Sequence, residues 1–336
     1  MSAAPAFTII DGHVHFVHPE RMDDILALMD AVPCAQANLV CLPNPDGTTQ
    51  NPAALHFRAH HPDRVFLSGA LAYGEALSWL VPGRLAEPAT AGSPEALARA
   101  AELLAVQIPA LKAQGFNGLK LIEGKPEVRK LLPFPLDGPL YAPLWAALER
   151  EQFPVVMHVG DPDEFWDPAR CPDWARASGW DYTDGTYPTK EDLYGELDAI
   201  LARHPGLRIT FAHFYFLSRD LDRAARFLDA HPIVCFDLTP HMDMYVDFSR
   251  DPASARAFFL RYQDRIIYGT DTDTRALARG PEGERLMRFI PQLIRAFLEQ
   301  EGELDLPGET RYRGLGLPRP VLEKIYHANF ERMFGI

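Results

Sequence analysis

The chain has 336 residues, 47% hydrophobic and 24% charged, a globular composition that excludes a disordered chain, a coiled coil and a collagen-like fibre. The formal net charge of −13 and the lack of long Lys/Arg runs argue against a nucleic-acid partner. No apolar run reaches the roughly 20 residues of a membrane helix, and because the N-terminus has no basic region and no long apolar segment, we expect no secretory signal. Because the four cysteines show no C-x-x-C spacing, we expect neither a zinc knuckle nor a disulfide scaffold, and we expect a cytoplasmic protein.

Short apolar runs alternate with helical patterns along the chain. Eight strands are predicted, at 7–10, 37–42, 64–71, 118–122, 154–158, 207–213, 232–238 and 265–268. Helices are predicted at 21–31, 94–114, 139–151, 190–204, 219–231 and 252–262. Continuous apolar runs fit strands buried on both faces, so the alternation predicts one (β/α)8 TIM barrel, a single domain over residues 1–336. A doubly wound sheet is the alternative, but the sequence lacks its G-x-G-x-x-G turn.

Two stretches depart from this alternation. Segment 160–189 follows the fifth strand and contains Trp166, Trp174, Trp180, Tyr182 and Tyr187. Long loops after barrel strands lie over the active-site mouth, so we expect some of these rings to form an aromatic core of their own and one or two to line the pocket. Residues 280–319 surround a helix predicted at 284–300, and a last helix is predicted at 320–333. We therefore expect an α/β barrel with an inserted loop after strand five and extra C-terminal helices.

Histidine or aspartate side chains follow four of the eight predicted strands. His13 and His15 end the first strand, His158 the fifth and His213 the sixth, and Asp271 follows the eighth. Residues two apart in a strand point to the same side, so His13 and His15 face together. Burying such side chains beside apolar strands is unfavourable unless they are paired or bind a metal, and imidazole suits Zn, Fe, Ni or Cu. A single histidine after a strand is more often an ordinary core or loop residue, but four strand ends that carry such side chains together indicate a metal site.

This pattern resembles the amidohydrolase superfamily, in particular its second amidohydrolase branch. That branch includes aminocarboxymuconate-semialdehyde decarboxylase, γ-resorcylate decarboxylase and pyrone-dicarboxylate lactonase. The resemblance lies in Asp11-Gly12-His13-Val14-His15, in His158 and His213, in Gly269-Thr270-Asp271 and in the closing segment 325–335. The resemblance spans residues 9–335 and implies the barrel fold. It does not indicate the substrate, and the inserted segment 160–189 resembles no member of the branch closely.

The resemblance also implies roles for these side chains. His13, His15, His158 and Asp271 would hold one divalent metal, with zinc the first choice and manganese or iron next. His213 would act beside the bound water as general acid or base. A metal lowers the pKa of such a water to about 7, an aspartate can take its proton, and an imidazole can shuttle that proton.

Three further residues are candidates for substrate binding. Lys120 lies inside the fourth strand, where a bare buried ammonium is costly, and we expect it to bind a substrate carboxylate or oxyanion. The alternatives are a structural salt bridge and, from binuclear members of the superfamily, a carboxylated lysine that bridges two metals. His241 follows strand seven and Arg275 follows strand eight. A solvated loop position for His241 and a surface ion pair for Arg275 are the competing interpretations.

The leading hypothesis is a metal-dependent hydrolase of a small polar substrate: an amide, a lactone or another carboxylic ester. A non-oxidative decarboxylase or hydratase of a small carboxylic acid uses the same ligands and is the alternative. A metal-binding barrel without catalysis is disfavoured because His213 and Asp271 can both handle protons. Phosphoester hydrolysis would gain weight only from a second metal. The expected partner is a small-molecule substrate, and whether it carries a carboxylate is left open. Whether the chain forms a homo-oligomer is also left open.

Overall fold

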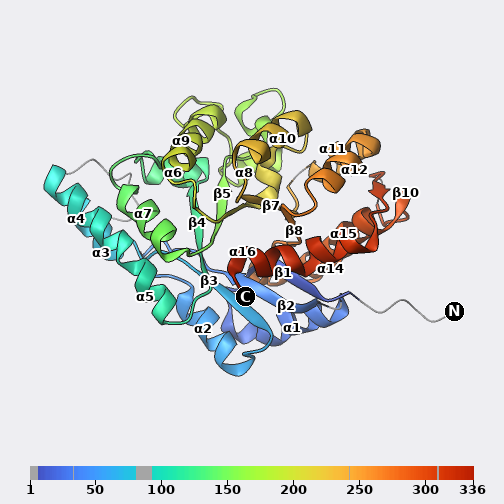
Figure 1. Ribbon diagram of the computed structural model, residues 1–336, viewed down its shortest axis with the longest axis horizontal. Coiled ribbons are helices and arrows are strands. Elements are labelled where there is room, and N and C mark those ends of the chain that lie inside the picture. Colours follow the sequence, from blue (N-terminus) through green and yellow to red (C-terminus); the bar gives the residue numbers. More distant parts are fainter. Residues whose placement is uncertain (1–6, 33, 81–92, 242, 309) are drawn as a thin grey trace. The chain divides into compact units, whose positions relative to one another are not determined.

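The computed structural model describes residues 7–32, 34–80, 93–241, 243–308 and 310–336, and in it strands alternate with helices along the chain (Figure 1). Residues 1–6, to which the expectation of no secretory signal refers, lie outside this part. The strands are β1 (Ile9–His15), β2 (Cys34–Val40), β3 (Val65–Gly69), β4 (Gly118–Gly124), β5 (Val155–Val159), β6 (Ile209–Phe211), β7 (Cys235–Asp237), β8 (Ile266–Ile267), β9 (Thr272–Asp273), β10 (Glu301–Glu303) and β11 (Arg313–Leu315).

Helices follow most of these strands. They are α1 (Met22–Ala31), α2 (Asn51–His60), α3 (Gly74–Leu80), α4 (Pro94–Ala105), α5 (Gln107–Ala113), α6 (Pro126–Leu131), α7 (Ala142–Glu151), α8 (Asp173–Ala177), α9 (Lys190–Arg203), α10 (Leu221–Ala230), α11 (Met244–Arg250), α12 (Pro252–Arg261), α13 (Thr274–Leu277), α14 (Pro281–Glu299), α15 (Arg319–Glu323) and α16 (Asn329–Phe334). Among the described residues, none of these helices combines the length and apolar character of a membrane-spanning segment.

Two predicted helices differ from the observed ones. The helix predicted at 94–114 is divided into α4 and α5, because Pro109 lacks the N–H that would bond to the carbonyl of Ala105 and its ring clashes there. The last helix is interrupted by a π-helical turn, Lys324–Ala328. Within that turn the carbonyl of Ile325 accepts a hydrogen bond from the backbone N–H of Tyr268, 2.9 Å away, just after β8. The π-helical turn therefore ties the C-terminal helices to the end of a strand.

The chain divides into two compact units, which are described separately. Unit 1 comprises the residues up to Cys41, Asn51–Ser68 and Thr210–Ile336, and unit 2 comprises Leu42–Gln50 and Gly69–Ile209. In unit 1, β9, β1, β2 and β3 pair in that order, and β6, β7 and β8 pair in that order, all in parallel. The backbone N–H of Gly12 in β1 donates to the carbonyl of Tyr268, 2.9 Å away. The expectation of a single domain stays a prediction.

Unit 2 contains the parallel pair β4 and β5, beside which α4 packs against α3 and α7 (Figure 1). The inserted segment between β5 and α9 builds a small core of its own from Phe165, Cys171, Ala175 and Tyr182. The rings of Trp166, Trp180 and Tyr187 pack against this core, whereas Trp174 is 48% exposed. The aromatic core expected for this segment is therefore confirmed.

A pair of glycine substitutions tests the packing of β1 against β8. A Cβ on Gly12 would lie 2.9 Å from Ile267 Cγ2 and 3.0 Å from the carbonyl oxygen of Tyr268, whereas one on Gly195 in α9 would meet nothing within 4 Å. Gly12→Ala is expected to lower the free energy of unfolding by roughly 1–3 kcal/mol through overpacking. Gly195→Ala is expected to raise it by about 0.5–1 kcal/mol through helix propensity. Denaturant unfolding measures the stability of both variants. A Gly12→Ala protein as stable as the wild type would contradict the close approach of Gly12 to Ile267 and Tyr268.

Candidate metal centre

The pairing of β9 with β1 places Asp271 beside two histidines of unit 1. Val14 pairs with Thr272, and His15 pairs with Asp273. Immediately before β9, the backbone N–H of Asp271 donates to the carbonyl of His13, 2.9 Å away, and Asp271 adopts a φ of 57°. Aspartate is one of the few residues that tolerate positive φ, so this turn suits the sequence. It directs the carboxylate toward the end of β1.

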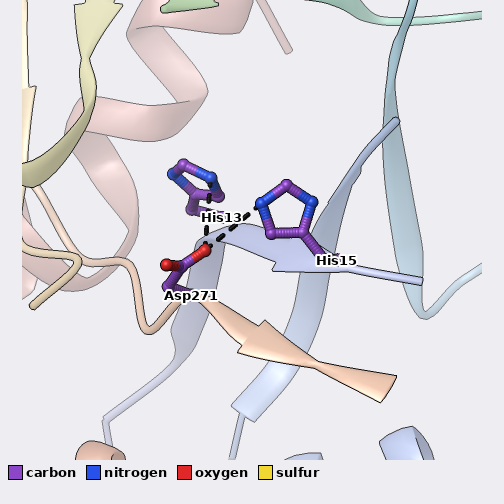
Figure 2. Close-up of side chains that lie close together, drawn as sticks. All are labelled: His13, His15 and Asp271. Atoms are coloured by element: carbon purple, nitrogen blue, oxygen red, sulfur yellow. Dashed lines mark ion pairs between the residues drawn. The ribbon is translucent and has the colours of Figure 1, made fainter. Parts of the chain in front are cut away.

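Three potential ligand atoms meet at this point, as Figure 2 shows. Asp271 Oδ1 lies 3.2 Å from His15 Nε2 and 3.7 Å from His13 Nε2, and all three atoms lie within 4.8 Å of one another. Burial raises the pKa of Asp271, but the hydrogen bond to His15 and the charges of the neighbouring imidazoles outweigh it and hold that pKa well below its ordinary value. The aspartate is therefore ionised and offers an anionic oxygen.

The other ring nitrogens of both histidines are anchored. His13 Nδ1 donates to Asp237 Oδ2 at 2.9 Å, and His15 Nδ1 donates to the carbonyl of Val40 at 3.1 Å. With Nδ1 protonated, a neutral imidazole carries its lone pair on Nε2. A proton on His15 Nε2 satisfies this arrangement as a hydrogen bond to Asp271 Oδ1, and a cation that displaces the proton would meet two ring lone pairs and a carboxylate oxygen. This donor set of two nitrogens and one oxygen fits zinc, manganese or iron.

His213 lies next to this group on an unusual turn. The strand predicted at 207–213 ends at Phe211, and residues 213–216 all have φ between 50° and 57°. Left-handed backbone costs roughly 1–2 kcal/mol per non-glycine residue, and here the burial of three aromatic side chains offsets it. The His213 ring centroid lies 6.0 Å from that of His13. Strained backbone of this kind concentrates at functional sites.

Asp237, at the end of β7, orients both of these histidines, a role that the sequence did not predict. Its Oδ1 accepts hydrogen bonds from the His213 backbone N–H (2.9 Å) and from the Thr239 hydroxyl (2.5 Å). Thr239 Oγ1 in turn accepts from His213 Nδ1 at 3.2 Å. Although burial raises the pKa of Asp237, the hydrogen bond from His13 and the nearby imidazoles lower it below its ordinary value. The only signal in the sequence is a polar residue after an apolar run, with Thr239 two residues on.

Asp237→Asn is expected to lower metal affinity by about 10–100-fold. An asparagine oxygen can replace Oδ1, which accepts three hydrogen bonds, and its NH₂ group would then face the N–H of His13 Nδ1. His13 would have to move its proton to Nε2, where it blocks ligation. Titration against a chromophoric chelator measures the affinity. Unchanged affinity would mean that the Asp237 contact does not determine the His13 tautomer.

His158 and Lys120 belong to unit 2. His158 ends β5, and its Nε2 lies 2.9 Å from the carbonyl of Gly160 and 3.2 Å from Asp161 Oδ1. Burial lowers the pKa of His158 and outweighs the opposing hydrogen bond and charge of Asp161, so the ring is neutral near pH 7. With two acceptors at Nε2, the proton sits there and the ring lone pair sits on Nδ1.

Lys120 is buried in β4 near a second buried carboxyl group. Glu123 Oε1 accepts from the Tyr73 hydroxyl at 2.6 Å, and its Oε2 accepts from the backbone N–H of Ile122 at 2.8 Å. Burial raises the pKa of Glu123, while the Tyr73 hydrogen bond and the Lys120 ammonium oppose the rise. The predicted binding of a substrate carboxylate by Lys120 stays a prediction.

His241 and Arg275 lie in unit 1. His241 Nε2 is 3.2 Å from the Ser218 hydroxyl, and its ring packs at a tilt against Phe216, which also packs against His213. One aromatic ring therefore separates His241 from His213. Arg275 pairs with Asp273, two residues away, at 2.7 Å. The predicted substrate contacts of His241 and Arg275 stay predictions.

Comparisons with known proteins show the family and the fold. The amidohydrolase family model matches residues 10–336. The structure is similar to an uncharacterised TIM-barrel protein of Bordetella bronchiseptica, at 15% identity over 98% of both chains and a TM-score of 0.58. It is also similar to a dihydroxybenzoic acid decarboxylase of Polaromonas sp. JS666 with bound manganese and the inhibitor 2-nitroresorcinol, at 14% identity over 98% of this chain and 97% of that chain (TM-score 0.57).

A third similar structure is a probable 2-pyrone-4,6-dicarboxylic acid hydrolase of Acinetobacter baumannii with citric acid bound. It shares 13% identity over 98% of this chain and 100% of that chain, with a TM-score of 0.52. A search of curated proteins finds no significant match. At these identities the structural likeness shows the fold alone. It confirms the predicted TIM-barrel fold class, and the family match confirms the predicted resemblance.

Proposed function

The chain belongs to the amidohydrolase family, and on that premise we propose that it is a metal-dependent hydrolase of a small amide, lactone or other carboxylic ester. The observation that carries the proposal is the convergence of His13 Nε2, His15 Nε2 and Asp271 Oδ1, with both Nδ1 atoms anchored. With Nε2 deprotonated, the two imidazoles and the carboxylate present three ligand atoms to one cation. His158 is proposed as a fourth ligand from the family resemblance.

A bound divalent metal would supply Lewis acidity, which polarises the substrate carbonyl and acidifies water. Zinc is the first choice, and the manganese in a similar decarboxylase supports manganese as the next. A single metal is favoured, and a second one bridged by carboxylated Lys120 is the alternative. Metal analysis of the wild-type protein and of Lys120→Ala separates the two.

The proton transfers are assigned to two residues of unit 1. Asp271 is ionised, so its carboxylate can take the proton of the attacking water. His213 is held through Nδ1 by Thr239, so its Nε2 lone pair can take up a proton and, as the imidazolium, deliver that proton to the leaving group. Lys120, His241 and Arg275 are proposed to bind the substrate, which we expect to carry a carboxylate that pairs with a cation.

A non-oxidative decarboxylase is the second candidate. Its support is the decarboxylases among the similar structures, which act on 2,6-dihydroxybenzoate and on 5-carboxyvanillate by their names. In that reaction the C–C bond to the carboxylate breaks, CO₂ leaves, and a proton replaces it on carbon. His213, protonated on both ring nitrogens as the imidazolium, would donate that proton.

Product analysis in ¹⁸O-labelled water tests the proposal. The metal-loaded protein is incubated with panels of small lactones, amides and aromatic carboxylic acids. Hydrolysis predicts one ¹⁸O atom in the product carboxylate and no CO₂. Stoichiometric CO₂ without ¹⁸O in the organic product would establish the decarboxylase and overturn the hydrolase.

A further inference from the structure

A buried network in unit 2 connects His158 to the inserted segment. Asp161 Oδ1 faces His158 Nε2 at 3.2 Å, while Oδ2 accepts from Lys125 Nζ at 2.7 Å and from the Tyr182 hydroxyl at 2.6 Å. Asp161 and Lys125 are both buried. Three donors from three places in the sequence therefore fix one carboxylate, which leaves it little freedom to turn.

The other two partners of Asp161, Lys125 and Tyr182, are themselves held in place by the insertion. Lys125 Nζ lies 4.4 Å from the centre of the Trp180 ring, so a cation–π contact holds the ammonium on its other side. Tyr182 belongs to the core of the insertion, and its backbone N–H donates to the carbonyl of Phe165, 2.8 Å away. The core of the insertion thus sets the positions of both groups that bind Asp161 Oδ2.

We propose that the inserted segment 160–189 is a clamp that holds the His158 imidazole in one orientation and one tautomer through the Gly160 carbonyl and the Asp161 carboxylate. Asp161 and Tyr182 are positioning residues, and the tautomer that they impose carries the proton on Nε2 and the lone pair on Nδ1. The consequence for metal binding rests on the proposed function, in which His158 is a ligand. The effect on the ring itself does not depend on any metal.

The ring is tested in the metal-free protein by ¹⁵N–¹H NMR of its histidine side chains, with His158→Ala used for assignment. The wild-type protein is expected to show His158 as a single Nε2–H tautomer. Asp161→Asn should produce a tautomer mixture, because it places an NH₂ group where Oδ1 was. Tyr182→Phe should produce a smaller change of the same kind, because it removes one of the two donors to Oδ2 and leaves Lys125. Tyr187→Phe is the matched control: Tyr187 packs on Tyr182, with ring centroids 4.7 Å apart, and no hydrogen bond within the described chain joins it to Asp161.

Metal affinity supplies the second measurement. Tyr182→Phe should raise the metal dissociation constant by about 10-fold, the lower end of what loss of an outer partner causes, while Tyr187→Phe leaves it unchanged. If both Asp161→Asn and Tyr182→Phe keep the wild-type His158 spectrum, the clamp is wrong. If their spectra change while His158→Ala binds metal like the wild type, the clamp stands and the proposed ligand role of His158 is wrong. Melting temperatures verify that each variant is folded.

Discussion

Asp271→Asn is expected to lower kcat by roughly 10²–10⁴-fold while the protein keeps its fold. The amide is nearly isosteric with the carboxylate but cannot accept a proton at neutral pH, so the attacking water loses its base. Asparagine also adopts positive φ readily, so the backbone at Asp271, with a φ of 57°, is not strained further. Turnover and melting temperature are measured on the same preparation.

A second aspartate of unit 1 provides the control for this substitution. Asp251 caps α12 by accepting from the backbone N–H of Ser254 at 3.1 Å, and asparagine is an equally good cap. Asp251→Asn is therefore expected to keep both turnover and stability. Near-normal turnover in Asp271→Asn would remove Asp271 from the mechanism, and a lower melting temperature with unchanged turnover per folded molecule would assign it a structural role.

His13→Ala and His213→Ala are expected to separate metal binding from proton transfer. His13 presents Nε2 to Asp271 at 3.7 Å, so its loss should lower metal content and activity together. His213 is assigned to proton transfer, so His213→Ala should lower kcat by roughly 10²–10⁴-fold while most of the metal stays bound. The metal-to-protein ratio and kcat of each variant measure the difference.

The control for both histidines is His327→Ala. His327 pairs with Glu331 on the C-terminal helices at 3.3 Å, so its loss should change neither quantity. If His213→Ala instead loses half of a two-metal complement, the single-metal account is wrong and Lys120 gains support as a bridge. A His13→Ala protein with full metal content would remove His13 from the ligands.

The sequence predicted the parts of the site that depend on strand periodicity. His13 and His15 are two residues apart in β1, and their ring centroids lie 5.2 Å apart, as expected for side chains on one side of a strand. Asp271 was predicted at the same site because it follows the eighth strand, whereas β9 was not predicted, because it has only two residues and no apolar run. That short strand nevertheless fixes the register of Asp271 against β1.

The turn at His213 and the contacts of Asp237 could not be predicted for different reasons. Phe214, Tyr215 and Phe216 are poor candidates for positive φ, so nothing local indicates a left-handed turn, and only tertiary burial of these rings stabilises it. The contact of Asp237 with His13 joins residues 224 positions apart. Such a contact follows from the pairing of strands in three dimensions, and spacing along one sequence does not contain it.

Metal analysis of the purified protein before and after chelation, with activity measured on the same samples, tests the central claim most directly. The account predicts about one divalent ion per chain, loss of that ion and of activity together on chelation, and recovery of both when metal is added back. A chelated protein that holds no metal and remains fully active would contradict it.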